Sequence, residues 1–248
     1  MAFDRYARWY DAFNAGKDYR AEAAYLLALI APWVPAPATW LDIGCGTGGH
    51  AAALADAGLA VDAVDPAAEM VAEARRRHPR LHVERADAET LPFAHRHDVT
   101  SMLFHVASYH AEEGRFARSL AAISARMKGD DLLLFDFWHS GGVLADPPGR
   151  RVRTVDIDGR RMTRIAVPRE DRSTSRVWVH YEFRLDGEHG TLVHTEEHAL
   201  RHFTTGEIEG AAAAAGLESL ACWRWGSDRP LGDADWYGLA CMRRGRGA

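Results

Sequence analysis

The spacing of hydrophobic positions predicts a chain that begins as alternating strands and helices. Residues 18–31 carry apolar side chains at helical spacing and are closed by Pro32. From residue 39 to residue 137, short apolar runs alternate with longer segments of helical period. Strands are predicted at 39–43, 59–65, 81–84, 98–104 and 131–137, and helices at 48–57, 67–77 and 113–127. Strands that alternate with helices in this way indicate a parallel sheet covered by helices on both faces.

The pattern changes to a period of two after residue 137, which is typical of antiparallel strands. Asp158-Gly159 is a hairpin signal, and Thr205 is the expected cap of a later helix. We therefore expect an antiparallel β-meander inserted at residues 143–204. Strands are predicted at 151–157, 161–167, 177–185 and 191–203 and, after a helix at 205–215, at 217–225 and 236–242.

Composition and charge exclude several classes of protein. A chain of 248 residues with 47% hydrophobic and 26% charged residues folds without disulfide or metal support, and its three cysteines are too scattered to provide either. The longest apolar run, residues 23–34, is too short to span a bilayer, and residues 1–20 contain no signal-peptide core, so we expect a cytoplasmic protein. The net charge of −5 argues against a nucleic-acid polymer or a membrane surface as partner.

The stretch W-L-D-I-G-C-G-T-G-G-H at residues 40–50 carries most of the chemical information. Gly44, Gly46 and Gly49 satisfy the pattern G-x-G-x-x-G between a strand and a helix, and Asp65 follows about 20 residues later. This spacing alone fits NAD, FAD or S-adenosylmethionine. Asp42 favours the last of these, because a carboxylate repels a pyrophosphate at the helix N-terminus but attracts the ammonium and sulfonium of S-adenosylmethionine.

Four motifs in chain order resemble those of class I S-adenosylmethionine-dependent methyltransferases. They are D-I-G-C-G-T-G at 42–48, D-P at 65–66, R-A-D-A at 85–88, and F-T-T-G-E-I followed by A-G-L in 203–217. The resemblance implies that Asp65 binds the ribose, Asp87 binds the adenine amino group and Met70 packs on adenine. The cofactor-binding residues expected on this basis are Tyr10, Tyr19, Asp42, Gly44, Cys45, Gly46, Asp65, Pro66, Met70, Ala86, Asp87, Ala88, Leu103 and Phe104.

The expected fold is α/β and Rossmann-like. It has a seven-stranded, mostly parallel sheet with helices on both faces, an N-terminal helical lid and the inserted antiparallel β-meander. We interpret residues 1–248 as a single methyltransferase domain. Its parts are the lid at 1–37, the cofactor-binding core at 38–142, the inserted sheet at 143–204, and the C-terminal helix with its closing strands at 205–248.

The N-terminal segment W-Y-D-A-F and G-K-D-Y, within residues 9–19, resembles that of N-methyltransferases acting on nucleotide-linked amino sugars. Those relatives also insert an antiparallel sheet after the fifth strand. The resemblance implies that Tyr10 and Tyr19 close over cofactor and acceptor, and that the acceptor atom is an amino nitrogen. Another small amine or a hydroxyl acceptor stays open, as do an NAD(P)-dependent oxidoreductase and a non-catalytic partner-binding protein with the same fold.

Arginines dominate the basic residues of the chain. Only Lys17 and Lys128 are lysines, and residues 150–176 contain nine arginines against four acidic residues. Because guanidinium forks suit phosphate, we hypothesise that the inserted sheet presents arginines to an anionic acceptor such as a nucleotide diphosphate sugar. A solvated hairpin face is the alternative interpretation. The acceptor-binding candidates are Arg151, Arg153, Arg164 and Trp138, the last of which could also simply pack.

An amine acceptor that arrives protonated needs a neutral imidazole or phenol to take its proton. The candidates near the ends of the fourth and fifth strands are His105, Tyr109, His110 and His139, of which we favour His105, Tyr109 and His139 as catalytic.

The segment His194-Thr-Glu-Glu-His198 spells H-x-x-E-H, a pattern of some zinc proteases. That pattern works on a helix, whereas this segment is strand-like, so we expect no catalytic metal. Exposed edges of the inserted sheet leave a monomer and a homodimer both open.

Overall fold

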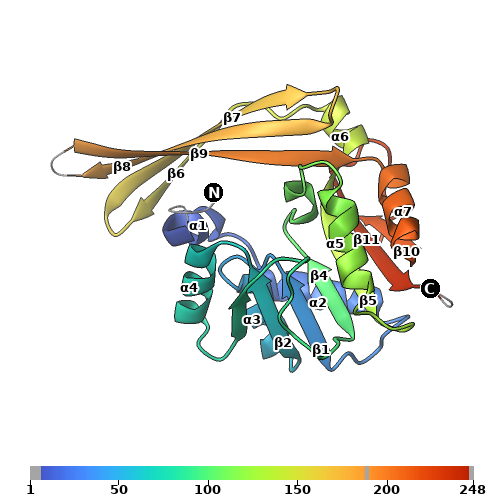
Figure 1. Ribbon diagram of the computed structural model, residues 1–248. Helices are drawn as coiled ribbons and strands as arrows, with labels where there is room; N and C mark the ends of the chain where they lie inside the picture. Colours follow the sequence, from blue (N-terminus) through green and yellow to red (C-terminus); the bar gives the residue numbers. More distant parts are fainter. Residues whose placement is uncertain (1–6, 188–189, 246–248) are drawn as a thin grey trace.

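A seven-stranded sheet forms the centre of the computed structural model, which describes residues 7–187 and 190–245. Its strands are β1 (Thr39–Ile43), β2 (Ala60–Asp65), β3 (His82–Arg85), β4 (Val99–Met102), β5 (Leu132–His139), β10 (Leu217–Arg224) and β11 (Tyr237–Arg244). They lie in the order β3-β2-β1-β4-β5-β11-β10, and of these seven strands β11 alone runs opposite to the other six (Figure 1). The predicted seven-stranded, mostly parallel sheet is confirmed.

Helices cover both faces of this sheet, as predicted. On one face lie α2 (Tyr19–Ile30), α3 (Gly49–Asp56) and α4 (Ala68–Arg77), and on the other lie α5 (Arg115–Ser124) and α7 (Thr205–Ala214). Successive strand residues point to opposite faces, so β1 contributes to two cores. Trp40 belongs to the cluster that contains Leu26 and Leu54, whereas Leu41 belongs to the cluster that contains Leu120.

The inserted segment forms four long antiparallel strands. They are β6 (Arg151–Ile157), β7 (Arg160–Asp171), β8 (Arg176–Gly187) and β9 (Gly190–Phe203). Asp158 and Gly159 have positive φ angles of 54° and 74°, as the predicted two-residue hairpin requires. Strand β7 continues through Pro168, beyond the predicted end at residue 167. Past Ala166 it has a partner on one side only, where a proline is tolerated.

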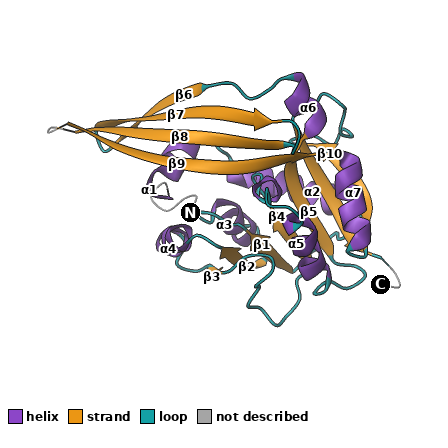
Figure 2. Cartoon of the chain, turned by 45° about the horizontal axis from the view of Figure 1, so that its top comes forward, coloured by secondary structure: helices purple, strands orange, loops and turns teal. Residues whose placement is uncertain are grey.

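The inserted sheet extends over the carboxyl ends of the parallel strands (Figure 2). It is continuous with the central sheet, because the end of β9 pairs in parallel with the end of β5 through Trp138–His202 and His139–Phe203. Beneath it lies α1 (Ala7–Asn14), which contacts both β6 and α4 (Figure 1). Phe13 of α1 is fully buried among side chains of β7 and β8. The N-terminal helix therefore fills the space between the insertion and the core.

Three local predictions were wrong. The strand predicted at 98–104 ends at Met102, because Phe104 and His105 adopt left-handed φ angles of 63° and 70°. The cap of α7 is Thr204 instead of Thr205, and it forms a reciprocal capping box with Glu207.

The third wrong prediction concerns residues 140–145, where no helix was predicted. They form α6 (Ser140–Ala145), in which two glycines follow the first residue. The short helix η1 (Ala107–Tyr109) follows the left-handed turn. Among the described residues, no helix is long and apolar enough to cross a membrane.

Candidate active site

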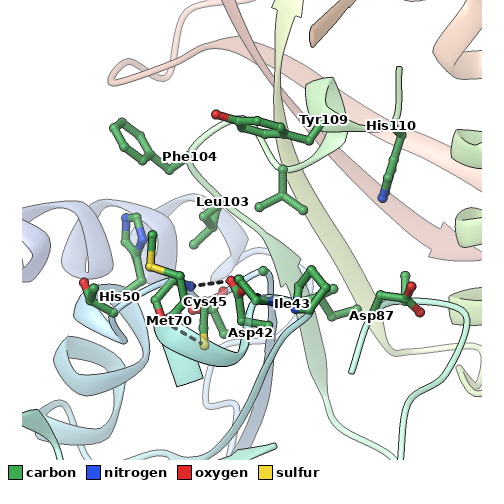
Figure 3. Close-up of a pocket in the computed structure, with 18 of the residues that line it drawn as sticks. Asp42, Ile43, Cys45, His50, Met70, Asp87, Leu103, Phe104, Tyr109 and His110 are labelled. Carbon is green, nitrogen blue, oxygen red and sulfur yellow. Dashed lines mark hydrogen bonds between the residues drawn. The ribbon is translucent and has the colours of Figure 1, made fainter. Parts of the chain in front are cut away.

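A cavity of about 340 Å³ lies where the carboxyl ends of β1 and β2 meet α1, η1 and β9. The glycine loop forms one side of this cavity, and Leu103, Phe104, Tyr109 and His110 form the opposite side (Figure 3). All the predicted cofactor residues line it except Ala86, which packs in the core beneath α5 instead. The residues in question are Tyr10, Tyr19, Asp42, Gly44, Cys45, Gly46, Asp65, Pro66, Met70, Asp87, Ala88, Leu103 and Phe104.

The glycine loop brings the backbone close to the far wall of the cavity. Gly44 has a φ of +72°, and a Cβ there would lie 2.5 Å from a methyl carbon of Val106. Gly49 begins α3, and a Cβ there would lie 2.5 Å from the ring of Tyr19. Both positions therefore require glycine for a steric reason, in addition to the turn that the motif makes.

The carboxylate of Asp65 is held at the end of β2 by two backbone amides. The N–H of Gly46 donates to Oδ2 at 2.9 Å, and the N–H of Ala67 donates to Oδ1 at 2.8 Å. Burial raises the pKa of Asp65 to about 6, although both hydrogen bonds act in the opposite direction. Each oxygen keeps a further lone pair, so the carboxylate can also accept hydroxyl groups from the cavity.

Asp42 places a buried and only partly satisfied carboxylate in the cavity wall. The hydroxyl of Ser101 donates to Oδ1 at 3.0 Å, and the indole N–H of Trp40 in turn donates to Ser101 at 2.8 Å. Oδ2 has no hydrogen-bond partner in the described part of the chain. Complete burial raises the pKa of Asp42, against the influence of nearby His50, Ser101 and Lys17. An unpartnered buried carboxylate oxygen is suited to a cationic ligand.

A charged cluster behind this wall was missed in the sequence. Nζ of Lys17 lies 3.3 Å from Oε2 of Glu22 and 3.4 Å from the centre of the Phe104 ring. Nε2 of His50, which lines the cavity, lies 2.6 Å from the same oxygen of Glu22. Burial lowers the pKa of Lys17, although Glu22 and Asp136 oppose this change. Two signals in the sequence pointed to Lys17, the scarcity of lysine and its place in the motif G-K-D-Y, but neither indicated this cluster.

The left-handed turn after β4 is held by Asp136 of β5. The backbone N–H of His105 donates to Oδ1 of Asp136 at 3.0 Å, and Nδ1 of the same histidine lies 2.8 Å from Oδ2, outside hydrogen-bonding geometry. Complete burial alone would raise the pKa of Asp136, but the charge and hydrogen bonds of His105 outweigh burial and lower it. The imidazole also stacks on Tyr237, with ring centres 4.9 Å apart. His105 thus lies beside the cavity, next to Phe104, without lining it.

Tyr109 connects the cavity to the inserted sheet. Its hydroxyl lies 3.0 Å from Nδ1 of His198, and Nε2 of His198 lies 3.0 Å from Oε2 of Glu196. His194 contacts the other carboxylate oxygen of Glu196 at 3.0 Å. The H-x-x-E-H segment therefore lies on strand β9, where His194, Glu196 and His198 alternate along one face, instead of on a helix.

Two of the other sequence candidates lie outside the cavity. Nδ1 of His139 is hydrogen-bonded to the carbonyl of Asp235 at 3.0 Å, and Trp138 packs against Trp236. His110 lines the cavity, and burial lowers its pKa to about 4, so that the ring is neutral. The lining residues that were not predicted as site residues are Ile43, Thr47, His50, Ala67, Val106, His110, Arg115 and Ala199.

The three arginine candidates lie on the inserted sheet, beyond the lining of the cavity. Arg153 pairs with Arg164, and Arg164 pairs with Phe183 on its other side, so these side chains share one face of the sheet. The guanidinium of Arg164 lies 4.9 Å from the ring centre of Phe13, which places this face toward α1. Arg151 lies one step further along the same face of β6.

Comparison with known proteins decides the family. Residues 41–129 match the methyltransferase domain family. The chain is 30% identical to dTDP-3-amino-3,6-dideoxy-alpha-D-glucopyranose N,N-dimethyltransferase of Streptomyces fradiae, over 85% of this chain and 83% of that protein. The chain belongs to the S-adenosylmethionine-dependent methyltransferases.

Other relatives are similar to this methyltransferase over most of its length. The chain is 24% identical to dTDP-3-amino-3,4,6-trideoxy-alpha-D-glucopyranose N,N-dimethyltransferase of Streptomyces venezuelae, over 84% of this chain and 88% of that one. The solved sugar N-methyltransferase KedS8 of Streptoalloteichus sp. ATCC 53650 superposes with a TM-score of 0.82 at 24% identity, over 96% and 93% of the two chains. The resemblance stated from the motifs is confirmed, and S-adenosylmethionine is the cofactor. The methyltransferase is therefore not the NAD(P)-dependent oxidoreductase that the glycine pattern left open.

Proposed function

We propose that this methyltransferase transfers a methyl group from S-adenosylmethionine to the amino nitrogen of a nucleotide-linked amino sugar. The observation that carries the proposal is the similarity to the Streptomyces fradiae enzyme, whose name states a dTDP-linked 3-amino sugar. That similarity spans most of both chains, so it includes the inserted sheet above the cavity as well as the glycine loop.

The cavity residues suggest how the cofactor is oriented. Asp65 would accept the ribose hydroxyls, and Asp87, at the end of β3, would accept the adenine amino group. Met70 is buried beneath α1 and would pack on the adenine ring. Asp42, with its unpartnered oxygen, would face the cationic methionine end. Tyr10 closes this end from α1, where its ring meets Phe104 edge to face at 6.3 Å.

His105 is the residue we propose to take the proton of the acceptor amine. The cofactor supplies the methyl group, and a nitrogen that gains a methyl must lose a proton to become a neutral amine again. Nδ1 of His105 faces Asp136, so Nε2 is the nitrogen that we propose to face the acceptor. Asp136 would stabilise the imidazolium that forms when Nε2 accepts this proton. Tyr109, fixed by His198, would orient the sugar from the roof of the cavity.

The arginines of the inserted sheet are the proposed contacts for the nucleotide. Arg151 lies close enough to Tyr237 for its charge to lower the pKa of that phenol, against the larger effect of burial, which raises it. Tyr237 in turn stacks on His105. A sugar amine at His105 therefore leaves its diphosphate near Arg151, with Arg153 and Arg164 further along the same face.

The direct test is an acceptor screen with S-adenosylmethionine. We expect mass spectrometry to detect mono- and dimethylated products of a dTDP-linked 3-amino sugar, with slower turnover of the free amino sugar. The matched control is the 3-hydroxy sugar nucleotide, which should release no S-adenosylhomocysteine above background. Turnover of the hydroxy compound alone would replace the proposal with O-methylation. The molar mass in solution will distinguish the monomer from the homodimer, both of which the sequence left open.

A further inference from the structure

Three histidine side chains surround the carboxylate of one aspartate in β2, and none of these four residues lines the cofactor cavity. Asp62 lies in the middle of β2, and His82 lies beside it in register on β3. Nε2 of His95 and Nε2 of His97 lie 2.6 Å and 2.8 Å from the same oxygen, Oδ2 of Asp62. Nδ1 of His82 lies 2.8 Å from the other oxygen, Oδ1. No step of the methyl transfer uses these four side chains.

The two halves of this cluster have different geometries. The ligand atoms of Asp62, His95 and His97 all lie within 4.8 Å of one another, which is the arrangement of a set of metal donors. His82 binds the second carboxylate oxygen, as the residues that orient a metal-binding carboxylate commonly do. The buried ring of Phe93 packs against all three imidazoles, at centre distances of 5.2, 5.9 and 6.0 Å. The cluster is therefore built on an apolar support.

We propose that Asp62, His95 and His97 bind one divalent first-row transition-metal ion of the zinc type, with His82 as a positioning residue. Two imidazoles and a carboxylate suit Zn²⁺, whereas Mg²⁺ and Ca²⁺ prefer oxygen ligands throughout. Donor atoms that each lie about 2.0–2.2 Å from one metal ion are further from each other than two hydrogen-bonded atoms are. One imidazole must therefore move outward when the ion binds. His95 can do so, because its side chain is 61% exposed, while His97, at 4%, fixes the inner position. Water from the exposed side completes the coordination.

The site would fasten a connection that lacks regular structure. The described residues 86–98, which join β3 to β4, form no helix, and they carry Asp87 near their start and both histidine ligands near their end. Arg126 holds the middle of this connection through the carbonyls of Leu91 and Phe93. A metal ion at Asp62 would hold its end against β2, and this consequence does not depend on which acceptor the enzyme methylates.

The test is Zn²⁺ binding by untagged protein treated with a chelator, followed by calorimetry and by competition with a chromophoric chelator. We expect one tight equivalent, and a rise of the melting temperature when Zn²⁺ is added. His82→Gln should weaken binding by roughly tenfold, as loss of an orienting partner does, and His95→Gln and His97→Gln, which remove ligands, should each weaken it more. His95 is exposed, so its variant stays informative even if His97→Gln misfolds.

His194→Gln is the matched control, because it removes an imidazole from a different histidine–carboxylate cluster, that of His194, Glu196 and His198 on β9. This variant should bind Zn²⁺ as the unaltered protein does. The proposal is overturned if the unaltered protein binds no Zn²⁺, if His95→Gln binds it with unchanged affinity, or if His194→Gln loses the tight equivalent instead.

Discussion

Acidification should weaken cofactor binding through Asp65, and the size of the effect follows from its surroundings. Burial raises the pKa of this carboxyl to about 6 in the protein without cofactor. Ribose hydroxyls donate to the ionised form, so each pH unit below that pKa costs roughly tenfold in affinity, or about 1.4 kcal/mol. Affinity should therefore be nearly constant above about pH 7 and roughly tenfold weaker at about pH 5.

Acidification changes the folding stability in the opposite direction to the cofactor affinity. A folded-state pKa above the ordinary value of 3.8 means that the folded protein binds more protons than the unfolded chain between those two pH values. The contribution of Asp65 to stability is therefore largest at low pH and is lost as the pH rises through about 6. Protonation of this one group should stabilise the protein without cofactor while it weakens the complex.

Calorimetric titration with S-adenosylhomocysteine across this pH range measures the affinity. Asp65→Asn should bind the ligand at least roughly tenfold more weakly at neutral pH, because it loses charge-assisted hydrogen bonds worth about 1.5–3 kcal/mol. Its affinity should also change less with pH. Asp56→Asn, which alters an exposed carboxylate, is the control. An unaltered protein whose affinity is the same at both pH values refutes the reasoning, and so does an Asp65→Asn variant that keeps the full pH slope. A slope lost only in Asp42→Asn would assign the effect to that carboxylate.

Three further substitutions test the acceptor side and the glycine loop. His105→Ala should lower kcat by roughly a hundredfold or more and change the acceptor KM less, and an unchanged kcat would remove this imidazole from the mechanism. Arg151→Ala should raise the acceptor KM while S-adenosylhomocysteine affinity in calorimetry stays constant; the idea fails if the KM does not move. Gly44→Ala should abolish measurable cofactor binding, because its Cβ meets Val106 at 2.5 Å in a left-handed turn, and near-normal binding would contradict this geometry.

The cofactor half of the site could be predicted from the sequence because it is local. Each of its main residues follows the carboxyl end of a strand, and neighbouring parallel strands bring their ends to one edge of the sheet. Asp42, Asp65 and Asp87 therefore meet at one cavity although each was identified in its own motif. Ala86 packs in the core and does not line the cavity, although Ala88, which belongs to the same core cluster, does.

The acceptor half depends on contacts that no local pattern encodes. Tyr109 meets His198 from a strand far along the chain, and His105 meets Asp136 across two neighbouring strands. The left-handed conformation of Phe104 and His105 could not be predicted, because a bulky residue such as Phe rarely adopts it and His adopts it in only a small fraction of cases. Asp136, which accepts the backbone N–H of His105, stabilises this turn from outside the segment. Such strain at the end of β4 is typical of a functional position.

The distribution of charge explains why a net charge of −5 carried so little information about ligands. Three buried carboxylates, Asp42, Asp65 and Asp136, lie in or beside the cavity wall, where low dielectric would strengthen their attraction for the cationic methionine end of the cofactor in the proposed orientation. Lys17 interacts with Asp42 and Asp136 but supplies only one positive charge against these three carboxylates. The excess of arginine in residues 150–176 lies instead on the sheet above. In the proposed binding mode, the cationic cofactor lies among carboxylates and the anionic acceptor lies beneath the arginines of the inserted sheet. An acceptor that entered the cofactor cavity would place its phosphates against carboxylates, and this repulsion disfavours binding there.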